Sequence, residues 1–82
     1  MNKSIYSKES KLLIERLKQA RKELGIDQKK AADLIGTSQS YISKVETGQL
    51  RIDVFQLKKF SNIYKKNIDF FLKWGVLWTK IN

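Results

Sequence analysis

The stretch QKKAADLIGTSQSYISKVETG, residues 28–48, decides how this chain folds. Its apolar residues recur at helical spacing on both sides of Gly36, so we expect two short helices joined by a turn that ends at Ser38. Helices joined by so short a turn must cross steeply, which requires a small side chain where they meet. Ala32 supplies that side chain, and Gly36 supplies a positive φ without strain. The stretch therefore predicts two crossed helices with a fixed turn.

The ends of these two helices are marked by residues that suit helix caps. Asp27 can cap a helix that runs from Gln28 to Ile35, and Ser38 can cap one that runs from Gln39 to about Thr47. Gly48 then stops the second helix. Their apolar sides are expected to face the core through Ala31, Ala32, Leu34 and Ile35 in the first helix and through Ile42 and Val45 in the second.

Three further helices are expected outside this stretch, because apolar residues continue at intervals of three and four. The first runs from Lys8 to Leu24 and is ended by Gly25. The second is capped by Asp53 and reaches about Tyr64, and the third is capped by Asn67 and runs from Ile68 to about Trp74. Their core positions are expected to be Leu13, Leu17, Ala20 and Leu24 in the first, and Val54 or Phe55, Leu57, Phe60 and Tyr64 in the second.

The composition predicts one small, all-α domain. The chain has 82 residues and no proline, and strong helix formers predominate. A chain this short has room for a single modest core. We therefore expect a compact five-helix domain at residues 8–73, preceded by an N-terminal arm at residues 1–7 and followed by an apolar C-terminal tail at residues 74–82.

The residue inventory argues against an enzyme or a metalloprotein. Cysteine and histidine are both absent, so the usual protein ligands of zinc are missing. The usual pairing of a catalytic nucleophile with a general base is missing as well. No glycine-rich loop that could cradle a phosphate is present. We therefore expect no catalytic residue, no metal site and no cofactor.

The charge favours a polyanionic partner. Seventeen Lys and Arg against eight Asp and Glu give a net charge of +9, which attracts nucleic acid or an anionic membrane. No apolar run approaches the ~20 residues of a membrane span, and the first helix lacks the bulky interfacial aromatic residues of a membrane-surface helix. The polar residues 1–10 do not resemble a signal peptide. We therefore predict a cytoplasmic protein whose partner is nucleic acid and not a membrane.

The pattern as a whole resembles the phage-repressor and Cro family of helix-turn-helix proteins, also called the xenobiotic-response-element type, over roughly Leu13 to Leu72. The matching positions are Gln28, Ala32, Gly36, Ser38, Gln39, Ser40, Ile42, Ser43, Val45, Glu46 and Gly48. The chain departs from the family at Ala31, where leucine is common, and at Lys65, where glycine is often found. The resemblance implies a lambda-repressor-like fold and a transcriptional regulator.

The second helix of the motif is expected to read double-stranded DNA. In helix-turn-helix proteins this helix enters the major groove with its N-terminus first, which places Gln39 and Ser40 at base edges. Gln can pair with adenine through two hydrogen bonds, and Ser can contact several bases. Lys44 lies one turn further on, where it can reach guanine or a phosphate. The predicted base contacts are therefore Gln39, Ser40 and Lys44.

Other polar residues around the motif are expected to hold the DNA backbone. The family places a glutamine such as Gln28 at the start of the first motif helix, where it can grip phosphate and brace Gln39. Lys29 and Lys30 share that turn. The predicted phosphate contacts are Gln28, Lys29, Tyr41, Ser43, Gln49 and Arg51.

The resemblance also implies that Arg21 and Glu46 form a structural ion pair, which fixes the second helix of the motif.

The function expected from all these features is sequence-specific binding of an operator by a transcriptional regulator, which is expected to be a repressor rather than an activator. An antitoxin-like or other protein-interaction module on the same fold is the alternative.

The apolar tail is the least explained segment of the sequence. Trp74, Leu77 and Trp78 are a large apolar load for nine residues. They could pack on their own domain near Leu13 or Phe71, or form the seam of a homodimer. A dimer would let two copies read two half-sites ~34 Å apart.

Overall fold

The computed structural model describes residues 8–72, and within that range it contains five helices and no strand. The helices are α1 Lys8–Leu24, α2 Gln28–Ile35, α3 Gln39–Glu46, α4 Val54–Tyr64 and α5 Ile68–Leu72. The all-α, five-helix prediction is confirmed. Helix α3 ends at Glu46, one residue before the expected Thr47, and the expected end of α5 near Trp74 lies outside the described residues.

Three helices begin at the predicted caps. A side-chain oxygen of Asp27 accepts a hydrogen bond from the backbone N–H of Lys30 at 2.8 Å, which starts α2. The Ser38 hydroxyl accepts from the N–H of Tyr41 at 3.1 Å and starts α3. Asp53 caps α4 in the same way. Each such cap stabilises its helix by about 1 kcal/mol.

Gly36 makes the tight turn between α2 and α3 possible. Its φ of 87° lies in the left-handed region, and its N–H donates to the carbonyl of Ala32 at 2.8 Å. Any residue with a Cβ pays roughly 1–2 kcal/mol to adopt this conformation. The turn therefore sets the angle at which α3 crosses α2.

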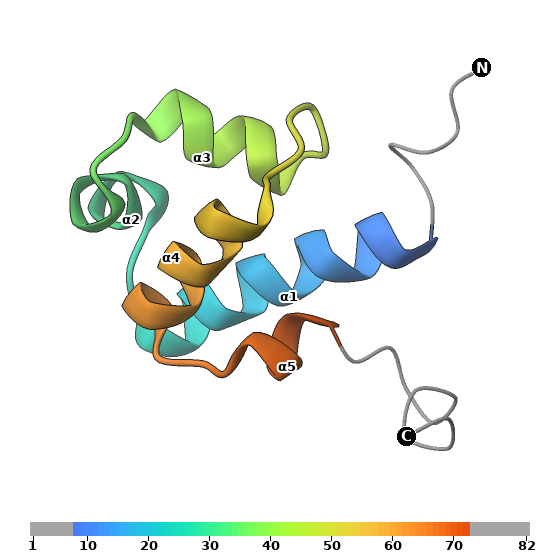
Figure 1. Ribbon diagram of the computed structural model, residues 1–82. Coiled ribbons are helices and arrows are strands. Elements are labelled where there is room, and N and C mark those ends of the chain that lie inside the picture. Colours follow the sequence, from blue (N-terminus) through green and yellow to red (C-terminus); the bar gives the residue numbers. More distant parts are fainter. Residues whose placement is uncertain (1–7, 73–82) are drawn as a thin grey trace.

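The core lies between α1, α2, α3 and α4, because α3 and α4 each pack on both α1 and α2. Helix α5 lies along α1 (Figure 1). Ala20 and Ala31 are completely buried, so neighbouring helices approach closely at both positions. The buried apolar residues are Leu17, Ala20, Ala31, Ala32, Ile35, Ile42, Val45, Leu57, Phe60, Tyr64 and Phe71. Ala31 therefore fills its place in the core without the leucine that is common there.

Three residues expected in the core are exposed. Phe55 is 81% exposed, Val54 64% and Leu34 45%, so these assignments were wrong. Phe55 precedes the buried Leu57 by two residues, which turns it roughly 200° around the helix. Val54 is the first residue of α4, three residues before its first buried residue, Leu57.

Helix α5 is held on α1 by charged groups around one aromatic ring. The Phe70 ring has the Arg16 guanidinium 5.1 Å and the Lys66 ammonium 4.8 Å from its centre. Arg16 also donates to the Phe70 carbonyl at 3.1 Å, and Lys66 pairs with Glu23 at 2.6 Å. The Lys66 hydrogen bond lowers the pKa of the exposed Glu23 carboxyl. These contacts fix the position of α5 on α1 up to Leu72, the last described residue.

Lys65 ends α4 in a conformation that suits glycine better. Its φ is 61°, and among residues 8–72 no other residue except glycine has a positive φ. We expect Lys65→Gly to raise the free energy of unfolding by about 0.5–1 kcal/mol, because relief of left-handed strain exceeds the added entropy of the unfolded chain. Thermal unfolding checks this, with Lys65→Ala as the control. Equal stability of the two variants would contradict it.

The hydroxyl of Tyr64 is buried without a hydrogen-bond partner among the described residues. Tyr64 is only 2% exposed. Burial, and secondarily the charge of Glu46, raise the pKa of the Tyr64 phenol above its ordinary value of 10.0. The folded protein therefore keeps this proton at a pH where the unfolded chain loses it, so stability must fall as the pH rises above about 10.

We expect Tyr64→Phe to raise stability by about 1 kcal/mol at neutral pH, because it removes a buried polar atom that has no partner. The variant should also lose less stability than the parent between neutral pH and pH 11. Denaturant unfolding at several pH values measures both effects. Tyr41→Phe is the matched control, since it deletes a hydroxyl that does have a partner. A Tyr64→Phe variant less stable than the parent at every pH would contradict this account.

Candidate nucleic-acid interface

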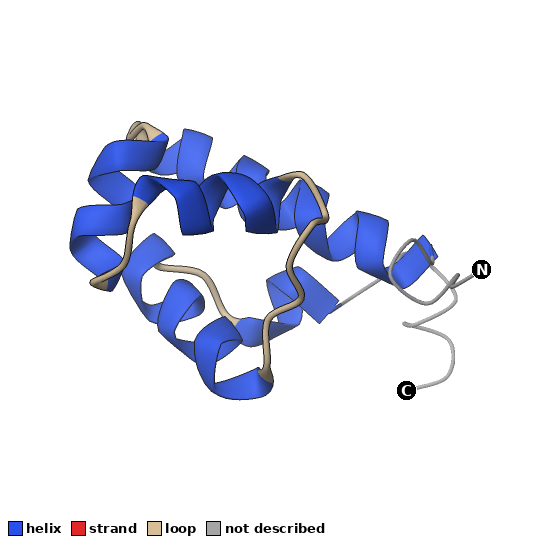
Figure 2. Ribbon diagram, turned by 90° about the horizontal axis from the view of Figure 1, so that it is seen from above, coloured by secondary structure: helices blue, strands red, loops and turns tan. Residues whose placement is uncertain are grey.

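Helix α3 lies on the outside of the molecule with one face free of other helices. It runs along the top of Figure 1 and across the front of Figure 2, which is seen from above. Its inner residues Ile42, Val45 and Glu46 are buried. Its outer residues include Gln39, Ser40 and Lys44, which are exposed. The three predicted base contacts therefore share the outer face of one helix.

A buried ion pair fastens α3 to α1. The Arg21 Nε donates to Glu46 Oε2 at 2.8 Å, and its Nη2 donates to Glu46 Oε1 at 3.1 Å. The Arg21 and Glu46 side chains are only 10% and 4% exposed. The hydrogen bond and the charge of Glu46 raise the pKa of the Arg21 guanidinium, so Arg21 stays charged. Arg21 also donates to the Ile26 carbonyl at 3.0 Å, which ties the α1–α2 turn to the same group.

A chain of hydrogen bonds runs from this pair to the surface. Gln28, at the start of α2, donates from Nε2 to Glu46 Oε1 at 3.1 Å. Gln39, at the start of α3, donates from Nε2 to Gln28 Oε1 at 3.4 Å. The amide of Gln39 is therefore oriented, through Gln28, by a buried carboxylate. Sequence reasoning anticipated that Gln28 could brace Gln39, but it missed the bond from Gln28 to Glu46.

Residues on α3 and just after its end are also held by side-chain hydrogen bonds. The Tyr41 hydroxyl accepts from Gln56 Nε2 on α4 at 3.0 Å. The Thr47 hydroxyl donates to the Ser43 carbonyl at 2.9 Å and accepts from Gln49 Nε2 at 3.0 Å. Gln56 was not among the predicted residues, because nothing in its sequence neighbourhood shows that it reaches Tyr41.

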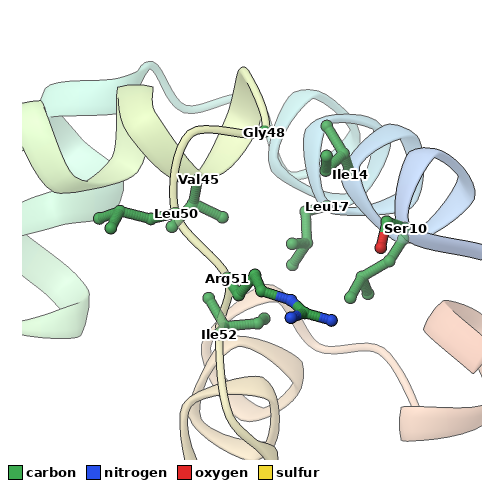
Figure 3. A pocket seen from close by; sticks show the side chains of 9 residues that line it. Ser10, Ile14, Leu17, Val45, Gly48, Leu50, Arg51 and Ile52 are labelled. Atoms are coloured by element: carbon green, nitrogen blue, oxygen red, sulfur yellow. The ribbon is translucent and has the colours of Figure 1, made fainter. Parts of the chain in front are cut away.

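The other predicted phosphate contacts lie on two sides of α3. Lys29 is exposed on the first turn of α2, beside Gln28. Gln49 and Arg51 are exposed in the segment that joins α3 to α4. The Arg51 side chain extends over an apolar cleft between that segment and α1 (Figure 3). The structure therefore brings Gln28 and Gln39 together and directs Arg51 toward α1.

Two kinds of feature are absent from the described part of the chain, namely a cluster of metal ligands and a helix that could span a membrane. Residues 8–72 hold no group of three or more acidic, histidine or cysteine side chains that could bind a metal ion. In the same range no helix combines the length and the apolar character needed to cross a bilayer.

Comparison with known proteins identifies this architecture. Residues 17–71, from the middle of α1 to α5, match the profile of the helix-turn-helix family. The chain belongs to the Cro/C1-type helix-turn-helix family. The match covers every core position from Leu17 to Phe71, so the compact lambda-repressor-like fold expected from the sequence is confirmed.

A curated relative of this helix-turn-helix chain comes from Bacillus subtilis (strain 168). It is named SPbeta prophage-derived uncharacterized HTH-type transcriptional regulator YonR, and it is 39% identical over 59 residues. The aligned region is 72% of this chain and 55% of the relative, so the chain spans about half the length of that protein. No solved structure matches the chain.

Proposed function

We propose that this helix-turn-helix chain binds double-stranded DNA at specific sequences and regulates transcription there. The observation that carries the proposal is the hydrogen-bonded chain from Glu46 through Gln28 to Gln39, which orients one amide on the exposed face of α3. Family membership and the regulator name of the YonR relative support it. The net charge of +9 supplies the attraction for a polyanion.

The hydrogen-bonding groups of the Gln39 amide that Gln28 does not use match the major-groove edge of adenine. A glutamine amide has two N–H donors and one carbonyl acceptor. One donor is used by Gln28, so one N–H and the carbonyl oxygen remain. Those two groups match N7 and the N6 amine of adenine in the major groove. We therefore propose that Gln39 reads an adenine, with Ser40 and Lys44 reading the neighbouring bases.

The remaining polar residues would grip the backbone on either side. Gln28 keeps one N–H beyond its bond to Glu46, and it stands at the N-terminus of α2, where the helix favours a phosphate. The full set proposed for phosphates is Gln28, Lys29, Tyr41, Ser43, Gln49 and Arg51. Such contacts add affinity and fix the register, while base contacts carry the sequence information.

A selection of binding sites from random duplex DNA tests this function. We expect one enriched sequence with an adenine whose replacement weakens binding by about 1–3 kcal/mol. Binding without any sequence preference, or no binding at moderate salt, would contradict the proposal. The second of these results would favour the alternative of a protein-interaction module on this fold.

Lys44 gives a separate test, because it can reach either a base or a phosphate. We expect Lys44→Ala to weaken binding to the selected site by about 1–3 kcal/mol and to weaken binding to random DNA much less. Titrations at several salt concentrations on both duplexes measure this. Equal losses on both duplexes, with a salt slope lower by about one, would assign Lys44 to a phosphate instead.

We further propose that the protein represses transcription from the cytoplasm as a homodimer, without catalysis. One α3 can contact only a few base pairs, whereas two copies spaced ~34 Å apart read two half-sites. A symmetric selected site with that spacing would support the dimer. The seam suggested by the sequence, Trp74, Leu77 and Trp78, lies outside the described residues.

A further inference from the structure

An apolar cleft lies between α1 and the segment that joins α3 to α4 (Figure 3). Its volume is about 170 Å³. Leu13, Ile14 and Leu17 come from α1, Val45 from α3, and Leu50 and Ile52 from the joining segment. Ser10 and Arg51 stand at its polar side. Most of the lining side chains are apolar, so the cleft favours an apolar occupant over a polar one.

We propose that the cleft binds an indole ring of the same chain, from Trp74 or Trp78. Residues 73–82 lie outside the described structure and contain Trp74, Leu77 and Trp78 without an acidic residue. The volume suits one ring, since a dry cavity of roughly 150 Å³ lined by Leu and Ile holds benzene. The Arg51 guanidinium over the cleft is a cation that can stack on an indole face.

The connection between α5 and α1 brings these residues within reach. Arg16 Nη1 donates to the Phe70 carbonyl oxygen at 3.1 Å. Along α1, Arg16 is one residue from Leu17 and three residues from Leu13, and both leucines line the cleft. Helix α5 ends two residues later, at Leu72, close to the first turns of α1 (Figure 1). Six residues from Leu72 to Trp78 span up to about 20 Å. The two residues from Leu72 to Trp74 span only about 7 Å, so Trp78 has the longer reach toward the cleft.

A second hollow, on α1, is a poor place for an indole ring. It is lined by Glu15, Lys18, Gln19, Lys22 and Glu23, all of which are charged or polar. An indole there would displace water from polar groups without replacing their hydrogen bonds. The apolar cleft is therefore the better site.

Tryptophan fluorescence of the full chain tests the proposal, because Trp74 and Trp78 are the two tryptophans of the sequence. The emission then reports on this segment alone. We expect blue-shifted emission and reduced quenching by acrylamide at every protein concentration. Emission typical of a ring in water would overturn the proposal. Protection that appears only at concentrations where the mass doubles would also overturn it, in favour of a seam between two copies.

A matched pair of variants locates the indole. Leu50, in the cleft, is 40% exposed, and Leu34, on α2 and away from the cleft, is 45% exposed. We expect Leu50→Asp to shift the emission to the red and to increase quenching, and Leu34→Asp to change neither. Circular dichroism checks that both variants fold. If Leu50→Asp folds and leaves both the emission and its quenching unchanged, the proposal is overturned.

A second measurement does not depend on changing Leu50. The chain has no cysteine, so one can be introduced and labelled with a nitroxide, which quenches tryptophan only at short range. We expect strong quenching from Gln49→Cys, an exposed position between the cleft residues Gly48 and Leu50, and none from Asp33→Cys, an exposed position on α2. Equal quenching from both positions would overturn the proposal. Because no DNA is present, a failure here leaves the DNA-binding proposal intact.

Discussion

Arg21→Ala is expected to lower the free energy of unfolding by about 3–5 kcal/mol, because it leaves the carboxylate of Glu46 buried without its cation. The Glu46 side chain is 4% exposed, so water cannot replace the guanidinium. Arg21 also holds the Ile26 carbonyl, and that hydrogen bond is lost as well. For a domain of this size each kcal/mol lowers the melting temperature by about 4–8 °C, so a fall of more than about 12 °C is expected.

Thermal unfolding followed by circular dichroism measures the effect, and two variants make it specific. Lys22→Ala changes the exposed neighbour of Arg21 on α1 and should leave the melting temperature nearly unchanged. Arg21→Met combined with Glu46→Leu removes both charges and should recover most of the loss, because an apolar pair of similar size can replace a buried ion pair. If Arg21→Ala melted at the parent temperature, the pair would have no structural role.

The buried pair also bears on the reading surface. Glu46 accepts hydrogen bonds from both Arg21 and Gln28, and Gln28 in turn holds Gln39. When Arg21 is removed, the Glu46 carboxylate loses the group that fixes its position, so its hydrogen bond to Gln28 weakens. We therefore expect Arg21→Ala to reduce affinity for DNA even at temperatures where the variant is folded. The residues that hold the surface in shape thus affect stability first and binding second.

The helices could be predicted from the sequence because their ends are set by local chemistry. Asp27, Ser38 and Asp53 each bond a backbone N–H three residues ahead, and such contacts depend on the chain alone. The exposure of Phe55 follows from helical spacing, because Phe55 lies roughly 200° around α4 from the buried Leu57. The exposure of Val54 could not be predicted in the same way, because it depends on what packs against the first turn of α4, and periodicity within α4 does not contain that information.

The positions of the site residues could be predicted further than their partners. Gln39, Ser40 and Lys44 share an exposed face because helical spacing requires it. The bonds from Gln28 to Glu46 and from Gln56 to Tyr41 join different helices, so they depend on the crossing angles. The direction of the Arg51 side chain depends on the cleft beside α1, which no sequence pattern marked. The DNA contacts themselves stay predictions.

Gln39→Ala is expected to cause the largest loss of sequence-specific binding with no loss of stability. Removal of the amide abolishes a contact worth about 1–3 kcal/mol, so affinity for the selected duplex should fall about 5- to 150-fold. Gln39 is exposed, and its bond to Gln28 is long at 3.4 Å, so the melting temperature should stay within about 2 °C of the parent value. Fluorescence anisotropy with labelled duplexes measures the affinities.

The control and the duplex series decide what Gln39 does. Gln19→Ala deletes the same amide from an exposed position on α1 and should leave DNA affinity unchanged. If Gln39 reads adenine, Gln39→Ala loses its preference at one base pair and binds duplexes altered at that pair about as well as the parent binds them, because the parent amide has no partner there. If the loss were equal on every duplex, Gln39 would be gripping the backbone, and the orientation given by Gln28 would serve affinity rather than sequence recognition.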